Sequence, residues 1–314
     1  MGAPLSALAV FLCCALYPST VLTEETSLSA SPSSLARCDS PYNTSCCSSK
    51  KHCPSLKSPL VDGYRTLSLS ETFAYLAYGG GSLARFGDGE IRAISGGHIV
   101  FEESTPELVR GLRFVSELGG SPESCLCVGT YPVLDANFSR FRRGKRRAFA
   151  EKIYRGYLKT WRRHMPEGTY CDSFVSRADA VNENEFSALE FFSPRWQSVF
   201  SGQRVLLIRG ATALNEPVTQ DPSVFERHLS RAQHVEQLTS FKSLDEHINL
   251  NTDSGMFKHY VGLRNEVLSR LESGKFDVAV LSLGATATVL AAELSCRGFR
   301  AIDVGQFGGN FEKI

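Results

Sequence analysis

Short apolar runs alternate with longer amphipathic segments along most of the chain. Runs rich in Val, Leu and Ile are typical of parallel strands that are buried on both faces of a sheet. Such runs lie at 83–86, 125–128, 170–176, 205–208, 278–283 and 301–304. Helical patterns separate several of these runs, so the sequence predicts an α/β fold: a Rossmann-like parallel sheet sandwiched by helices.

Local punctuation marks where the helices begin and end. Ser68 and Glu71 have the spacing of a capping box, which opens a helix that Gly79–Gly81 closes after Tyr78. Thr105-Pro106 is a typical helix start, with proline in the first turn. An apolar stripe then follows at helical spacing as far as Gly119-Gly120. Further helices are predicted at 145–164, 255–271 and 286–294.

The N-terminal region differs from the rest in composition. An apolar segment at 7–16 is short for a bilayer span, which predicts a signal peptide or a signal anchor over residues 1–23. A segment rich in Ser, Pro and Cys follows at 24–62 and is typical of a stem or linker. Residues 63–314 are expected to form the main folded domain, and the apolar segment could tether the protein to a membrane.

Cysteines and glycosylation motifs indicate the secretory route. The stem holds Cys38, Cys46, Cys47 and Cys53, an even number that suits disulfides in an oxidising compartment. The acceptor motifs Asn43-Thr44-Ser45 and Asn137-Phe138-Ser139 agree with passage through the ER or Golgi lumen, or with secretion. Four further cysteines, in apolar contexts, are expected to be free and buried: Cys125, Cys127, Cys171 and Cys296.

Overall charge excludes some classes of partner. The chain has 34 Lys+Arg against 33 Asp+Glu, so no nucleic-acid partner is expected. Neither a CxxC pair nor an HExxH motif is present, so a zinc site is not expected.

A pair of carboxylates follows the run at 83–86. Asp88 and Glu90 alternate with Gly87 and Gly89 in what reads as a turn. If the backbone stays extended there, both side chains face the same side. Paired carboxylates suit a hard cation such as Mn²⁺ or Mg²⁺ that is shared with phosphate groups, although an Asp-Gly pair is also an ordinary turn former.

Two other loops are expected at the same carboxyl edge of the sheet, where ligands bind in such folds. Gly284, Thr286 and Thr288 lie where a strand leads into a helix, so free backbone N–H groups could bind phosphate. Asp303 closes the last strand and could bind a sugar hydroxyl or the metal. Each loop could equally be an ordinary turn.

Taken together, these segments resemble the GT-D class of glycosyltransferases, known from bacterial enzymes that extend glycans on serine-rich adhesins. The resemblance covers roughly residue 67 to the C-terminus, with order and spacing preserved. It rests on Arg85–Glu90, Pro106–Leu108, Phe174–Arg177, Trp196, Val205–Ile208, Leu283–Leu290 and Ala301–Gly305.

The resemblance implies a nucleotide-sugar transferase, UDP-linked by analogy, whose acceptor is a glycan or glycoprotein. Its DxE motif, here Asp88 and Glu90, would bind the divalent metal at the donor diphosphate. Donor-binding candidates are Arg85, Gly87, Arg177, Gly284, Thr286 and Thr288. Asp303 and Glu312 are the candidates for the catalytic base.

The chain departs from the family pattern in three places. Arg209 replaces the usual acidic residue after 205–208, and Gln306 and Gly308 stand where a histidine and an acidic residue are common. These changes predict an altered acceptor, or a binding protein without turnover. A metal-dependent hydrolase of phosphoanhydrides is a third hypothesis, because the same carboxylates could activate water.

A basic run at 140–147 has no assigned role. A solvated surface is the simplest interpretation, with a charged acceptor, anionic lipid or the donor's phosphates as alternatives. Residues 143–146 also resemble a furin-type processing site.

Overall fold

A computed structural model describes residues 60, 62–78, 80–99, 102–120, 125–131, 155–156, 158–176, 188–209, 227–238, 240–242, 247–249 and 257–305. Several predictions lie outside these residues. They concern the N-terminal segment and stem, both glycosylation motifs, the basic run at 140–147, Arg177, Gln306, Gly308 and Glu312.

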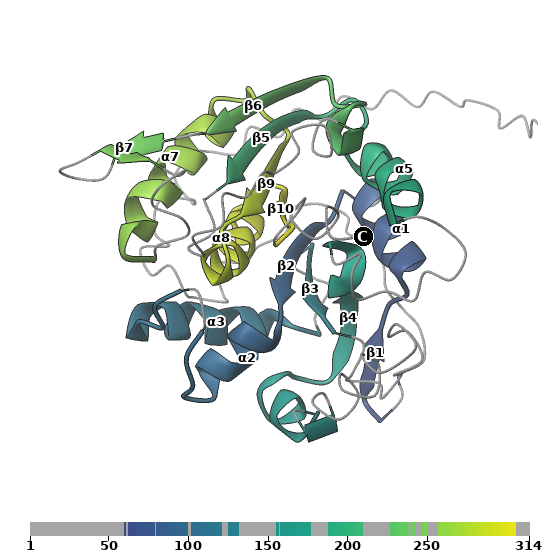
Figure 1. Ribbon diagram of the computed structural model, residues 1–314, viewed down its shortest axis with the longest axis vertical. Coiled ribbons are helices and arrows are strands. Elements are labelled where there is room, and N and C mark those ends of the chain that lie inside the picture. The colour runs from purple at the N-terminus through teal and green to yellow at the C-terminus, as the bar shows by residue number, and fades with distance from the viewer. Residues whose placement is uncertain are drawn as a thin grey trace, which may run out of the picture. The chain divides into compact units, whose positions relative to one another are not determined.

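Eight parallel strands form one sheet, as predicted (Figure 1). Each neighbouring pair of strands is parallel. Their order across the sheet is β1 (Tyr64–Thr66), β4 (Gly168–Asp172), β3 (Leu126–Thr130), β2 (Ser82–Phe86), β10 (Ala301–Asp303), β9 (Val278–Ser282), β5 (Arg204–Arg209) and β6 (His234–Leu238).

Alternating side chains of the central strands enter two separate apolar clusters. In β9, Val278 and Val280 belong to one cluster, whereas Ala279 and Leu281 belong to the other. Both faces of the sheet are therefore buried, which explains why its central strands read as continuous apolar runs.

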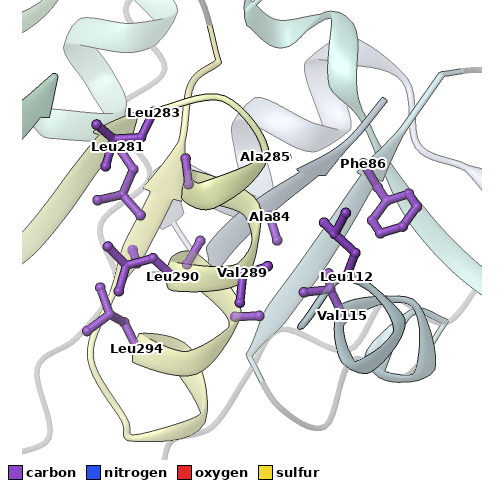
Figure 2. Packing of buried hydrophobic residues seen from close by; sticks show 14 of the residues in the cluster. Ala84, Phe86, Leu112, Val115, Leu281, Leu283, Ala285, Val289, Leu290 and Leu294 are labelled. Carbon is purple, nitrogen blue, oxygen red and sulfur yellow. The ribbon is translucent and has the colours of Figure 1, made fainter. Parts of the chain in front are cut away.

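Helices supply the outer layers of both clusters. α1 (Leu69–Tyr78) packs against α5 (Ala188–Phe200), with Phe73 and Trp196 edge to face at a centroid distance of 5.1 Å. The other cluster takes side chains from α2 (Asp88–Ile94), α3 (Pro106–Leu118), α7 (Tyr260–Glu272) and α8 (Ala285–Cys296). Figure 2 shows Val289 of α8 and Leu112 and Val115 of α3 in this cluster.

The predicted helix starts are confirmed. Ser68 Oγ accepts from the N–H of Glu71 at 3.2 Å, and Glu71 Oε2 accepts from the N–H of Ser68 at 2.8 Å, so the capping box is complete. Thr105 caps α3, its side chain accepting from the N–H of Leu108. Minor elements are the 3₁₀ turns Ser173–Ser176 and Phe257–His259, and the antiparallel pair β7 (Ser240–Lys242) and β8 (His247–Asn249).

The run at 170–176 is a strand only in its first part. β4 ends at Asp172, whose Oδ1 accepts from the N–H of Phe174 at 2.9 Å and so turns the chain into a 3₁₀ helix. A side chain that bonds the backbone two residues on forms a local turn that interrupts the strand.

The prediction of free cysteines in the body is wrong. Cys127 of β3 and Cys171 of β4 form a disulfide with a Cα–Cα distance of 5.7 Å, and Cys125 and Cys296 are also disulfide-bonded. β3 and β4 are neighbours in the sheet, so the two thiols lie side by side. An apolar strand context alone does not distinguish a free thiol from a bonded one.

Candidate functional site

The sheet has a topological switch point between β2 and β10. From β2 the chain continues to β3 and β4 on one side, whereas β10 and β9 lie on the other side. In open α/β sheets the crevice at the carboxyl ends of such strands is the usual ligand site. The three loops predicted to carry chemistry all leave the sheet here.

Asp303 joins these loops. Its Oδ2 accepts from the N–H of Arg85 at 3.2 Å and lies 3.0 Å from Thr288 Oγ1, and its Oδ1 accepts from the N–H of Gly305 at 2.8 Å. Thr288 Oγ1 also lies 2.6 Å from the carbonyl oxygen of Arg85. Arg85, Thr288 and Asp303 are thus brought together as the sequence predicted.

The Asp303 carboxyl group is buried, with 1% of the residue exposed. Burial raises its pKa to about 6, an effect that nearby Arg85 opposes. Both oxygens are engaged by protein donors, which suits a positioning role. Its catalytic role stays a prediction.

Arg85 carries the guanidinium group of the site. It lies over Gly305, where an added Cβ would be 1.5 Å from Arg85 Nη1. Its Nε is buried and makes no hydrogen bond in the described part of the chain. Arg85 also lowers the pKa of Glu90, so the guanidinium is near the carboxyl groups of both Glu90 and Asp303 and retains capacity for an anion.

Asp88 and Glu90 lie in a helix, which corrects the expectation of an extended turn. They belong to the first turn of α2, where residues two apart differ by about 200° around the axis. Glu90 turns back to accept from the N–H of Gly87 at 2.8 Å. A Cβ on Gly87 would lie 2.9 Å from Glu90 Oε2, so glycine permits this contact.

The two carboxyl groups have different environments. Burial raises the pKa of Glu90 to about 7, although Arg85 opposes the shift. The Asp88 side chain is 47% exposed, with Tyr131 donating to its Oδ1 at 3.3 Å and Arg92 Nη2 at 4.0 Å from its Oδ2. Asp88 is therefore the more accessible of the pair.

Two contributors to the site were missed by sequence reasoning. Tyr131 directly follows β3, so the rule that located the other loops could have found it. Glu102 comes from the segment before α3 and carries no motif. It lies at the N-terminus of α8, the predicted phosphate position.

Glu102 is held by α8 through backbone and side-chain contacts. Its Oε2 accepts from the N–H of Ala285 at 2.7 Å and of Thr286 at 3.3 Å, and its Oε1 contacts Thr286 Oγ1. Gly284 leaves room for it, because a Cβ there would lie 2.9 Å from Glu102 Oε2. Burial raises the pKa of Glu102 to about 8 against the effect of these bonds.

The remaining predicted positions add little to this centre. Arg177 and Glu312 lie outside the described residues. Arg209 ends β5 and is half-buried, and this burial lowers the pKa of its guanidinium.

A metal ion at this site would need oxygen ligands from a bound substrate in addition to those of the protein. In the described part of the chain, no three His, Cys, Asp or Glu side chains are grouped to hold a metal ion. Mg²⁺ is commonly bound by one or two carboxylates together with substrate phosphates. The Asp88 side chain is exposed and could supply one such carboxylate. Glu90 accepts from the N–H of Gly87 and lies about 200° from Asp88 around the helix axis, so the helix does not by itself direct both carboxylates to one point.

Fold and site together define an α/β protein with a guanidinium group, a helix N-terminus and acidic side chains at the carboxyl edge of its sheet. The chain belongs to the family described as Glycosyltransferase GT-D fold, which matches residues 83–313. The predicted family is therefore confirmed.

Curated relatives are bacterial. Glycosyltransferase GlyD of Streptococcus pneumoniae serotype 4 is 24% identical over 258 residues, covering 82% of this chain and 28% of that protein. A probable glycosyl transferase, Gly, of Streptococcus gordonii is 22% identical over 248 residues, covering 78% of this chain and 32% of that protein. The chain spans less than a third of the length of these relatives.

Solved structures confirm the fold. A domain of unknown function 1792, described as having a distinct glycosyltransferase fold, matches with a TM-score of 0.64 and 21% identity, covering 80% of this chain and 81% of that chain. A new glycosyltransferase from Streptococcus sanguinis matches with a TM-score of 0.62 and 20% identity, covering 81% and 84%.

Proposed function

We propose that this protein is a metal-dependent glycosyltransferase that moves a sugar from a nucleotide sugar, UDP-linked by analogy, to a glycan or glycoprotein. One observation carries the proposal. Arg85, the N-terminus of α8 and the carboxylates of α2 converge at the switch point of a GT-D fold.

The reaction needs charge stabilisation at the diphosphate. The bond between the anomeric carbon and a diphosphate oxygen breaks, and the leaving nucleoside diphosphate keeps the electron pair. A hydroxyl oxygen of the acceptor forms the new bond and gives its proton to a base. Arg85 would stabilise the negative charge that develops on the leaving group.

Asp88 and Glu90 would hold Mn²⁺ or Mg²⁺ together with diphosphate oxygens. A cation bound there would neutralise part of the charge of the leaving group. Tyr131 orients the more exposed of these carboxylates through its bond to Asp88 Oδ1. Glu90 is fixed by the N–H of Gly87.

Donor binding must displace Glu102. The N–H groups of Ala285 and Thr286 would bind a donor phosphate, and Glu102 now occupies them. The segment before α3 therefore changes position or conformation when the diphosphate enters.

The position of Glu102 at the N-terminus of α8 favours a second candidate function. In this second candidate, the protein binds nucleotide sugars without turnover. If Glu102 is not displaced fully, the diphosphate would be bound without the contacts that stabilise its departure. Such a protein would bind donor in a metal-dependent manner and release neither free sugar nor product.

We place the protein in the secretory pathway, in the Golgi or ER lumen or secreted. The apolar segment at 7–16 and the disulfide between Cys127 and Cys171 support an oxidising compartment. Among the described residues, the helices are too short or too polar for a bilayer crossing. The proposed membrane tether is the apolar segment at 7–16.

Binding and turnover of UDP- and GDP-sugars, with and without Mn²⁺, test the proposal. Asp88→Ala and Glu90→Ala should each abolish metal-dependent donor binding. They should also abolish any slow hydrolysis of the donor. Glu117→Ala is the matched control, because Glu117 is exposed on α3 away from the site. A folded protein that binds none of these donors would contradict both candidates.

A further inference from the structure

A basic cavity lies on the helical residues 155–156 and 158–164. Its volume is about 550 Å³, and it is lined by Arg155, Leu158, Lys159, Arg162 and Arg163. Four of these five residues are cationic, and no carboxylate is among them. Their spacing of three and four residues places them along one side of a helix, over about 12 Å of its length.

The buried side of this helical segment packs against the candidate active site. Trp161 is fully buried, and its ring lies edge to face with Phe86 at 6.4 Å and at 6.2 Å from Tyr131. Phe86 ends β2, and Tyr131 donates to Asp88. The cavity is thus attached through one side chain to the strand ends that carry the site.

The cations of the cavity are only partly compensated. Arg162 is fixed by Asp62, with Nη2 to Oδ2 at 3.5 Å, and lies over the ring of Tyr64 at 5.2 Å. Within the described residues, neither Lys159 nor Arg163 has a carboxylate within ion-pair distance. Like charges at i and i+4 repel each other and destabilise a helix. An anion bound between the cationic side chains would offset this repulsion.

His164 also indicates a positive potential here. Partial burial lowers its pKa, and Arg163 and Arg113 lower it further. Arg113 comes from α3 and is exposed. The positive region therefore extends beyond the residues that line the cavity.

We propose that this cavity binds an acidic segment of the acceptor glycan through its carboxylate or sulfate groups. The inference rests on the proposed function, because it names the acceptor class of that same transferase. Arginine forks match the planar carboxylate and the oxygens of sulfate.

The cavity fits other polyanions less well. None of its described lining residues is aromatic, whereas proteins that bind single-stranded nucleic acids stack bases on aromatic residues. Leu158 is the one apolar residue among the described residues that line it, whereas helices that bind membranes present a broad apolar face. An open depression with four cations is suited to a discrete, flexible, sugar-based anion.

The test measures binding to the full chain without any donor. A sulfated heparin-derived oligosaccharide, a carboxylated hyaluronan oligosaccharide and a neutral chitin-derived oligosaccharide are compared by calorimetry. We expect the acidic sugars to bind at least about tenfold more tightly than the neutral one. The double variant Lys159→Ala/Arg163→Ala should lose about tenfold in affinity for them.

Arg231→Ala/Lys275→Ala is the matched control, because both residues are exposed and lie outside the cavity. It should bind like the unmodified protein. Equal affinity of the cavity variant and the control, or equal binding of acidic and neutral sugars, would overturn the inference. Binding of a single-stranded oligonucleotide or of phosphatidylserine vesicles in place of the sugars would also overturn it.

Donor binding is measured on the same samples. Loss of acidic-sugar binding in the cavity variant, with UDP-sugar binding unchanged, supports the inference. Acidic-sugar binding in a protein that binds no nucleotide sugar would sink the proposed function while leaving the cavity assignment standing as a binding site.

Discussion

Replacing Glu102 should strengthen nucleotide binding, which is an unusual direction for a change in a partly buried, hydrogen-bonded carboxyl group. Glu102 contacts the N-terminus of α8 through two backbone N–H groups and Thr286 Oγ1. A donor phosphate that uses those N–H groups must first displace it. Under the proposed function, the affinity for UDP is therefore reduced by the free energy that stabilises the Glu102 contact.

The magnitude follows from the three contacts. At about 1 kcal/mol of net stabilisation each, they contribute about 3 kcal/mol. Immobilising the Glu102 side chain costs about 1–2 kcal/mol in rotamer entropy. A net 1–2 kcal/mol remains, so Glu102→Ala should tighten UDP binding by about 5- to 30-fold. The loss of this helix cap should lower the free energy of unfolding by about 0.5–2 kcal/mol.

Calorimetric titration with UDP and with uridine checks this expectation. Uridine lacks phosphate, so its affinity should be the same in the variant and the unmodified protein. Glu102→Gln keeps the shape of the side chain and an acceptor oxygen, so it should shift UDP affinity less than Glu102→Ala does. Unchanged or weaker UDP binding by a folded Glu102→Ala protein would refute the reasoning.

Three further outcomes are expected. Gly305→Ala should weaken UDP-sugar binding about tenfold, because the added Cβ would overlap Arg85 Nη1 and the residue has φ of 56°; calorimetry with unchanged affinity would contradict this. Replacing Cys127 and Cys171 with alanine should lower the free energy of unfolding by about 2–5 kcal/mol in urea titrations, because the bond closes a separation of 44 residues; an unchanged midpoint would count against it. His228 is buried with a pKa held near 4, mainly by burial, against an ordinary value of 6.5. The unfolded chain binds the proton more readily, so stability should fall as pH drops from 6.5 towards 4, by up to about 3 kcal/mol, and His228→Gln should reduce that slope.

The central sheet was predictable because its strands are buried on both faces. Their continuous apolar runs identify them from the local sequence alone. Capping residues such as Ser68 and Thr105 marked the helix starts. β6 was missed because it forms one edge of the sheet and three of its first four residues are exposed. α5 was missed as well, and Pro194 within it makes the helical pattern harder to read.

α2 shows where local propensity was overridden. Gly87-Asp88-Gly89 favours a turn, yet the segment is helical. Burial of Ile91 and Ile94, together with the return of Glu90 to the N–H of Gly87, stabilises the helix. The change of secondary structure alters the expected orientation of the two carboxylates, so their role depends on a contact that the sequence did not reveal.

The site residues that lie at the ends of strands could be predicted from the sequence. Arg85, Thr288 and Asp303 each lie at or directly after such an end, and the structure brings them into contact. Glu102 was not predictable, since it reaches Ala285 across 183 residues of sequence. A long-range contact from a segment without a motif leaves no periodic or local signal.

Under the proposed function, donor affinity is a difference between two sets of contacts. If a donor phosphate binds at the N-terminus of α8, Glu102 competes with it there, whereas Arg85 lies over Gly305 and has a buried Nε without a hydrogen bond in the described part. Removing the competitor should raise affinity, and displacing the guanidinium should lower it. Because both residues act at the same switch point, opposite signs for Glu102→Ala and Gly305→Ala would place the diphosphate between them. If both substitutions changed UDP affinity in the same direction, the phosphate would not contact both residues. The contact between Glu102 and α8 would then only cap the helix.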